Sequence, residues 1–196
     1  MEKLVLDKPA RIIKNRKTLE EELDVKISQR GRELFIEGEG KDKHIGKKVL
    51  QAIDFGFNVD DALLLSGEED YKFEKINIKS ISKAKDMQKV RGLIIGKGGK
   101  ALSTLSKLTN CIIQMNGNKI GIIGLPEWTD IAREGIRQLA LGIKHSTVYS
   151  YLEKHQPEPV LDLGLKEGFK DKDIKELRES RKEKEELREN FENKEK

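Results

Sequence analysis

Apolar residues recur every second position in some segments of this chain and every third or fourth position in others. This pattern predicts a series of short strands and helices. Segment 71–81 alternates apolar with polar residues, as a half-buried strand does. Leu102, Leu105 and Leu108 recur three residues apart, which places them on one face of a helix. The middle of the chain is therefore the part in which the pattern is clearest.

The middle third predicts the order strand, helix, glycine loop, helix, strand, strand, helix. The expected elements are a strand over 71–81, helices over 82–95 and 99–109, a hairpin over 111–124 turning at Asn116-Gly117, and a long helix containing Ile131, Ile136, Leu139, Leu141 and Ile143.

The first third resembles a shortened copy of this order. The expected elements are a strand over 3–7, a single helix over 10–23, a hairpin over 25–39 around Arg30-Gly31, a helix over 43–53, a break at Gly56 and a new helix capped near Asn58. A fold with two similar units follows from this repetition.

The last forty or so residues have a different composition. Pro157 and Pro159 mark a linker, and from Leu165 onward 22 of 32 residues are charged, with the two signs interleaved. Opposite charges three or four residues apart favour a solvated helix. We therefore predict three parts: residues 1–66, residues 67–156, and a linker with a charged helical tail over 157–196.

Charge is distributed unevenly along the chain. Residues 1–70 hold 13 basic and 16 acidic residues, whereas residues 71–164 hold 15 basic and 8 acidic residues. Segment 71–100 contains nine basic residues and only two acidic ones, Glu74 and Asp86. Such a concentration of positive charge is typical of a surface that binds a polyanion.

Several classes of site are disfavoured by the residue content. Cys111 is the only cysteine, which excludes an intrachain disulfide, argues against a thiolate metal cluster and fits a buried position. His44, His145 and His155 show no metal-ligand spacing. We expect no metal, no cofactor and no membrane span, because no apolar stretch approaches about 18 residues. The N-terminus lacks a secretory signal pattern, so a cytoplasmic protein is expected.

The glycine-rich loop over residues 96–100 has the composition of a phosphate site. A Walker loop needs Ser or Thr after its lysine, but Gly98 follows Lys97. A dinucleotide fingerprint needs a third glycine and a later acidic residue, where this chain has Ala101 and Asn118. Neither nucleotide motif fits the spacing.

The loop does fit the G-x-x-G pattern that joins two helices in KH domains and clamps a single-stranded nucleic-acid backbone. Glycines let the backbone approach a sugar-phosphate closely, and the following helix presents free N–H groups to a phosphate. Aliphatic residues beside the loop would form the wall of a groove for unstacked bases. The predicted RNA-binding residues are Arg91, Ile94, Ile95, Gly96, Lys97, Gly98, Gly99, Lys100 and Leu102.

Segment 93–124 resembles a type I KH domain, and its continuation to His155 is similar to the archaeal and eukaryotic small-subunit assembly factors of the Dim/Partner-of-Nob type. The most family-specific phrase is His145–Glu153, and Val49–Leu65 is similar to the segment that closes the first KH unit in that family. The resemblance covers roughly residues 20–155.

This resemblance implies an α+β fold of two tandem type I KH units, each βααββα. It also implies binding of single-stranded small-subunit rRNA or its precursor near the 3′ end, in ribosome biogenesis. The implied partners are that RNA and a PIN-domain endonuclease or a translation initiation factor. Tyr149 and Tyr151 are expected to seal the two units together, and Gln114 and Asn116 are candidate hydrogen-bond partners of bases.

The first unit departs from the family pattern because it has no G-x-x-G loop. One alignment places residues 10–13 at the loop position and another places residues 14–17 there; neither supplies a glycine. We therefore predict a degenerate first unit that acts as a scaffold, although Lys14, Arg16 and Lys17 remain candidates for a phosphate contact.

Two other functional classes stay open. The chain could be an adaptor that recruits a nuclease or translation factor with weak RNA contact, or a nucleotide-binding enzyme. We see no nucleophile with a base and no paired acids at the loop, so we predict that the chain is not an enzyme.

Overall fold

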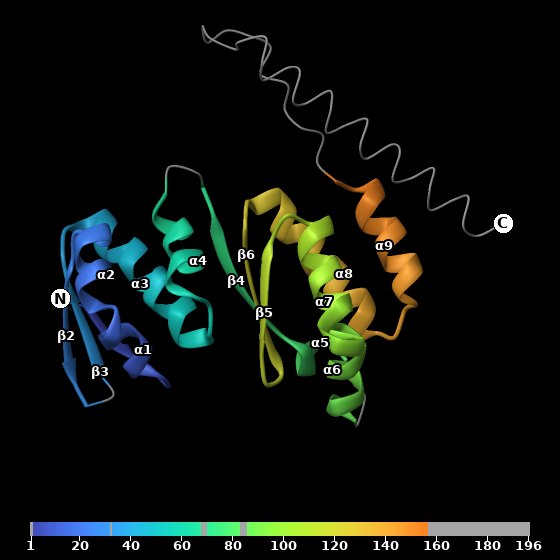
Figure 1. The fold of residues 1–196 in the computed structure, drawn as a ribbon, viewed down its shortest axis with the longest axis horizontal. Coiled ribbons are helices and arrows are strands. Elements are labelled where there is room, and N and C mark those ends of the chain that lie inside the picture. Colours follow the sequence, from blue (N-terminus) through green and yellow to red (C-terminus); the bar gives the residue numbers. More distant parts are fainter. Residues whose placement is uncertain (1, 32, 68–69, 83–85, 157–196) are drawn as a thin grey trace, which may run out of the picture. The chain divides into compact units, whose positions relative to one another are not determined.

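The computed structural model describes residues 2–31, 33–67, 70–82 and 86–156 (Figure 1). The predicted linker and charged helix over 157–196 lie outside these residues. Residues 1–157 cluster into one compact unit. Within it we call residues 2–66 the N-terminal half and residues 70–156 the C-terminal half.

The N-terminal half contains one antiparallel sheet in the order β1-β3-β2. Its elements are β1 Glu2–Val5, α1 Pro9–Lys14, α2 Arg16–Leu23, β2 Lys26–Arg30, β3 Glu33–Glu37, α3 Gly40–Phe55, α4 Val59–Leu63 and a 3-10 turn, η1, at Leu64–Ser66.

The C-terminal half contains a second antiparallel sheet, in the order β4-β6-β5. Its elements are β4 Lys72–Asn77, α5 Ile78–Ile81, α6 Met87–Ile95, a 3-10 turn η2 at Lys97–Gly99, α7 Lys100–Leu108, β5 Ile112–Asn116, β6 Lys119–Gly124, α8 Pro126–Ala140 and α9 His145–Lys154. In both halves the third strand lies between the other two.

Several boundaries differ from the predictions. The expected helix over 10–23 is two helices, α1 and α2, which meet at Asn15. The expected strand over 71–81 ends at Asn77, whose side chain accepts a hydrogen bond from the Lys79 N–H and begins α5. Local side-chain capping overrides the apolar alternation at this position.

The long helix predicted after the hairpin is also shorter than expected. It ends at Ala140, and Leu141 and Ile143 lie beyond it, 52% and 39% exposed. Gly142, at φ +85°, reverses the chain before α9. A glycine in the left-handed region is a frequent way to end a helix, and apolar spacing alone did not reveal it.

Strand β6 is buried on both faces, which explains its apolar sequence. Ile120 and Ile122 pack in the core beneath α8, while Gly121 lies on the opposite face of the sheet. A Cβ at Gly121 would lie 2.7 Å from the Phe57 ring and 2.8 Å from the Phe55 ring. The sheet is therefore covered by helices on one face and by the N-terminal half on the other.

Three aromatic rings join the two halves. Phe55, Phe57 and Phe73 lie with ring centroids 5.7–6.1 Å apart. Ile123 packs into the core of the N-terminal half, and the Asn116 Nδ2 donates to the Phe55 carbonyl at 2.8 Å. Aromatic burial of this kind is a large stabilising term, so the halves form one body.

The predicted role of Tyr149 and Tyr151 in sealing the units is wrong. Both residues pack against the core of the C-terminal half, because α9 contacts α7 and α8 on the helical side of the sheet. The N-terminal half contacts the other face of that sheet. The two tyrosines therefore hold α9 in place.

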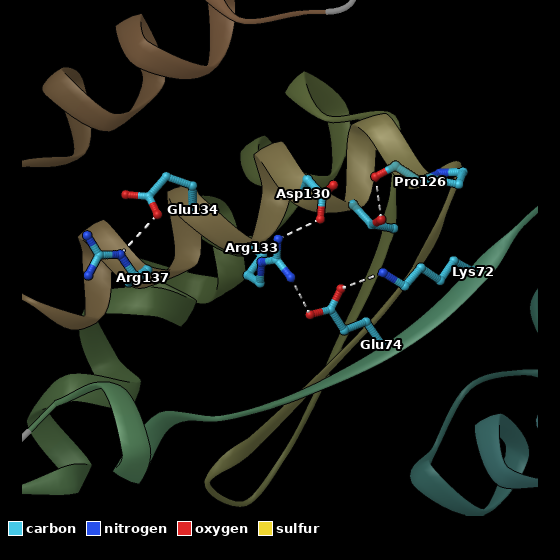
Figure 2. A network of polar contacts seen from close by, with 8 residues as sticks. Lys72, Glu74, Pro126, Asp130, Arg133, Glu134 and Arg137 are labelled. Carbon is cyan, nitrogen blue, oxygen red and sulfur yellow. Dashed lines mark hydrogen bonds and ion pairs between the residues drawn. The ribbon is translucent and has the colours of Figure 1, made fainter.

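A polar network ties α8 to β4 (Figure 2). Arg133 donates to Glu74 at 3.1 Å and to Asp130 at 2.6 Å. The Lys72 Nζ lies 3.6 Å from Glu74 Oε2. These side chains are partly exposed, so the network orients α8 more than it stabilises the fold.

Among the described residues, no helix is both long and apolar enough to cross a membrane.

Candidate nucleic-acid interface

The predicted loop joins α6 to α7 through three glycines with positive φ. Gly96, Gly98 and Gly99 have φ of 72°, 61° and 79°. Residues that have a Cβ rarely adopt a positive φ, because the Cβ then approaches the backbone carbonyl. At Gly96 the constraint is also steric, since a Cβ would lie 2.6 Å from that of Ala101. The close turn therefore requires glycine at this position.

Open space surrounds the outer part of the loop. A Cβ placed at Gly98 or Gly99 would meet no atom within 4 Å. The Gly96 N–H donates to the Gly92 carbonyl at 2.9 Å, and the Gly99 N–H donates to the Gly96 carbonyl at 3.3 Å. These bonds set the shape of the loop while leaving its tip accessible.

Helix α7 begins at this loop without a side-chain cap. Gly99 is its N-cap residue, in the left-handed conformation, and no side chain accepts from the first N–H groups. Free N–H groups and the positive end of the helix dipole favour an anion here. Lys97 and Lys100 are exposed, and within the described residues neither side chain forms an ion pair or hydrogen bond.

The aliphatic residues of the predicted site separate into two groups. Ile95 and Leu102 are partly buried and keep some exposed surface on either side of the loop. Ile94 is fully buried in the core, so it supports α6 from inside and presents no surface to a base. Arg91 is partly exposed one turn before the loop. Of the nine predicted residues, only Ile94 is buried.

The two candidates on β5 also differ. Gln114 is exposed on the edge strand. Asn116 uses its side-chain amide to bind the Phe55 carbonyl, which gives it a structural role between the halves.

Cys111 follows α7 and is buried, as its apolar surroundings predicted. Burial raises the pKa of its thiol to about 11, against an opposing hydrogen bond with Thr109. The thiol therefore stays protonated at neutral pH and is a poor nucleophile. No group of three or more His, Cys, Asp or Glu side chains suited to a metal ion occurs among the described residues.

His145, at the start of α9, had no predicted role and contacts the helix that leads into the loop. Its Nε2 is 2.8 Å from the Leu93 carbonyl oxygen in α6. The signal available in the sequence was the family-specific phrase 145–153, but nothing in its spacing indicated a contact 52 residues away.

Residues 72–157 match the family model described as eukaryotic type KH-domain (KH-domain type I). The chain is 31% identical over 148 residues to a KH domain-containing protein of Methanocaldococcus jannaschii, covering 72% of this chain and 65% of the relative. It is 34% identical over 109 residues to the RNA-binding protein pno1 of Drosophila melanogaster, covering 55% and 45%. The chain thus spans less than two thirds of these curated relatives.

Solved structures agree with these relatives. Dim2p from Pyrococcus horikoshii superposes with a TM-score of 0.71 at 27% identity, over 78% of this chain and 98% of that one. The a/eIF2alpha–aDim2p–rRNA complex from the same organism matches with a TM-score of 0.71 at 28% identity, over 78% and 92%. The predicted KH fold is confirmed, and the chain is similar to KH-domain proteins related to archaeal Dim2p and pno1.

Proposed function

We propose that this protein binds single-stranded rRNA of the small ribosomal subunit, or its precursor, near the 3′ end and assists its maturation. The α6–α7 loop is the proposed clamp. The observation that carries the proposal is the uncapped start of α7 at an open glycine loop that carries two exposed lysines, Lys97 and Lys100.

The chemistry of this loop suits a phosphate of an extended strand. The N–H groups at the start of α7 donate to phosphate oxygens, while Lys97 and Lys100 add charge without reading sequence. Ile95 and Leu102 offer apolar surface to unstacked bases on both sides. The proposed contact residues are Arg91, Ile95, Gly96, Lys97, Gly98, Gly99, Lys100 and Leu102.

The comparisons support the ribosomal part of this proposal. A relative in Chaetomium thermophilum, 30% identical over 111 residues, is a pre-rRNA-processing protein PNO1, and the Dim2p relative was solved together with a/eIF2alpha and rRNA. We infer that any cleavage of the RNA belongs to a partner, such as a PIN-domain endonuclease. A translation initiation factor is a second candidate partner.

The test compares two variants with the same change in charge. Gly98→Asp/Gly99→Asp adds two negative charges at the loop, and Lys14→Gln/Lys17→Gln removes two positive charges at the α1–α2 junction. Asp tolerates the left-handed region and is a good N-cap residue, so the loop variant is expected to fold.

Binding is measured by fluorescence anisotropy with a labelled single-stranded oligonucleotide of the small-subunit rRNA 3′ end. We expect at least about a 30-fold loss for the loop variant, because the two carboxylates repel the phosphate and compete with it for the N–H groups at the start of α7. The control should lose less than about threefold. The wild-type log affinity should fall with log salt by roughly 0.7 per neutralised phosphate.

Equal binding of duplex and single strand would contradict the groove. Unchanged affinity in the loop variant, with partner capture retained, would instead favour the adaptor function. Crosslinking in cells followed by sequencing tests the ribosomal assignment: reads spread over messenger RNA without enrichment at the rRNA 3′ end would contradict it.

A further inference from the structure

His145, the first residue of α9, makes a contact at the end of the helix that leads into the glycine loop. Its Nε2 lies 2.8 Å from the Leu93 carbonyl oxygen, and the side chain is partly buried. A carbonyl oxygen only accepts hydrogen bonds, so Nε2 must carry a proton and donate. The contact therefore selects the Nε2–H tautomer or the imidazolium.

The Leu93 carbonyl is the first in α6 that lies past the last helical hydrogen bond. That last bond runs from the Gly96 N–H to the Gly92 carbonyl. In a continuing helix the Lys97 N–H would donate to Leu93 next, but Gly96, at φ 72° and ψ 177°, turns the chain away. His145 supplies the donor that the turn removes, and basic side chains at a helix C-terminus are favourable.

The end of α8 is shaped to bring His145 to this point. The Gly142 N–H donates to the Leu139 carbonyl at 2.9 Å, and the Ile143 N–H donates to the Gln138 carbonyl at 3.1 Å. This pair of bonds is a Schellman motif, which requires the left-handed conformation found at Gly142. The chain reverses within four residues and starts α9 beside α6.

Helix α9 is anchored independently of this contact. Val148 and Leu152 are fully buried in the core of the C-terminal half, and Figure 1 shows α9 beside α8. The Tyr149 ring lies one turn after His145 with a centroid separation of 6.0 Å. The imidazole is thus held by a fixed helix, so its N–H can restrain α6.

We propose that His145 is a positioning residue for the RNA clamp. Its N–H holds the end of α6, and through it the direction in which Gly96 leaves the helix. The loop then keeps the conformation in which the start of α7 is open to a phosphate. This inference rests on the proposed RNA binding, and it assigns to α9 a part in forming that site.

The experiment separates the hydrogen bond from the ring volume. His145→Phe keeps a ring of similar size without a donor, and His145→Gln supplies an amide N–H at nearly the same reach. Ser146→Ala, at the exposed neighbouring position, is the matched control. Two readouts are taken on the full chain: affinity for the labelled rRNA 3′-end oligonucleotide, and amide hydrogen exchange of Gly96–Gly99 without RNA.

We expect His145→Phe to weaken RNA binding about fivefold, the effect of one net hydrogen bond. The same variant should exchange its loop amides faster in the free protein. Binding and exchange in His145→Gln and Ser146→Ala should stay within about twofold of wild type, since neither removes the donor.

Equal losses in His145→Phe and His145→Gln would overturn the inference, because ring volume would then be what matters. Unchanged loop exchange in His145→Phe would overturn it as well. If His145→Phe fails to fold, nitrogen chemical shifts of the wild-type imidazole decide: a neutral ring protonated at Nδ1 overturns the proposal. Failure of the wild type to bind RNA defeats the proposed function, while loop exchange still tests His145.

Discussion

The two halves of this protein share a strand order but differ at the junction between the two helices that precede the hairpin. At the α6–α7 junction three glycines with positive φ form an open loop, and α7 starts without a side-chain cap. At the α1–α2 junction a single residue, Asn15 at φ −109°, separates the helices. The first arrangement exposes backbone donors, and the second leaves no loop.

Asn15 closes its junction with its own hydrogen bonds. Its N–H donates to the Ile12 carbonyl at 3.1 Å, and its side-chain Nδ2 donates to the Arg11 carbonyl at 2.9 Å. The structure therefore agrees with the alignment that places residues 14–17 at the loop position. These bonds satisfy two carbonyls at the end of α1, whereas no side chain caps the start of α2, as none caps α7.

The arginines at the α1–α2 junction have partners within the chain, unlike the lysines at the glycine loop. Arg16 Nε lies 2.9 Å from Glu20, and Arg11 Nη1 donates to the Gly56 carbonyl at 3.3 Å. Lys97 and Lys100 have no such partner within the described residues. Arg11 and Arg16 thus have partners within the N-terminal half, whereas Lys14 and Lys17 are exposed and, within the described residues, their side chains form no ion pair or hydrogen bond.

This contrast teaches that the strand order and the anion site are separable. A sheet of the same topology survives when the glycines are absent, because the core residues and the hairpin determine it. Anion binding depends on a few residues that keep backbone N–H groups open. Substitutions at the two junctions test whether the glycine geometry is the decisive difference.

The largest effect is expected for Gly96→Ala. The new Cβ would overlap Ala101 and force a left-handed alanine, which should lower the free energy of unfolding by at least about 2 kcal/mol. Gly98→Ala meets open space and should cost only about 1 kcal/mol from its backbone conformation. Urea denaturation of both variants measures the difference. Equal losses would show that the turn at Gly96 tolerates a side chain.

A smaller effect is expected when glycine is placed in the other junction. Asn15→Gly removes the side-chain bond to the Arg11 carbonyl and adds conformational entropy to the unfolded chain. We expect a loss of about 1 kcal/mol in the free energy of unfolding and RNA affinity within twofold of wild type. A clear gain in RNA affinity would mean that one glycine suffices to make a clamp, contrary to the comparison.

The smallest effect concerns the acid dependence of the N-terminal half. Burial raises the pKa of Glu20, but hydrogen bonds from the Ile27 N–H and Arg16, with the Arg16 charge, lower it overall. A lowered pKa in the folded state gives stability that is present above about pH 4.5 and is lost as pH falls through the folded value.

Glu20→Gln should remove this dependence, with a difference below about 1 kcal/mol because the pair is partly exposed. Thermal unfolding between pH 3 and pH 7 measures it, with Glu21→Gln as an exposed control. If the stability of wild type and of Glu20→Gln changed with pH in the same way, the interaction between Arg16 and Glu20 would contribute nothing measurable to stability.

Much of the fold followed from the sequence pattern. The hairpin at Asn116-Gly117 was predicted from local turn chemistry, and Gly117 has the expected positive φ of 59°. The glycine loop between two helices was also predicted, because lysines and glycines at that spacing exclude the nucleotide motifs. These features depend on neighbours in sequence, so the sequence alone determines them.

Tertiary structure decided what each residue faces. Ile94 and Ile95 are adjacent in sequence, but only the packing of α6 against the core shows that Ile94 is buried. Gly121 looks like an ordinary strand glycine until the rings of Phe55 and Phe57 are placed against it. The contact between His145 and the Leu93 carbonyl joins positions 52 residues apart. Such contacts are set by the packing of whole elements, which short-range periodicity does not encode.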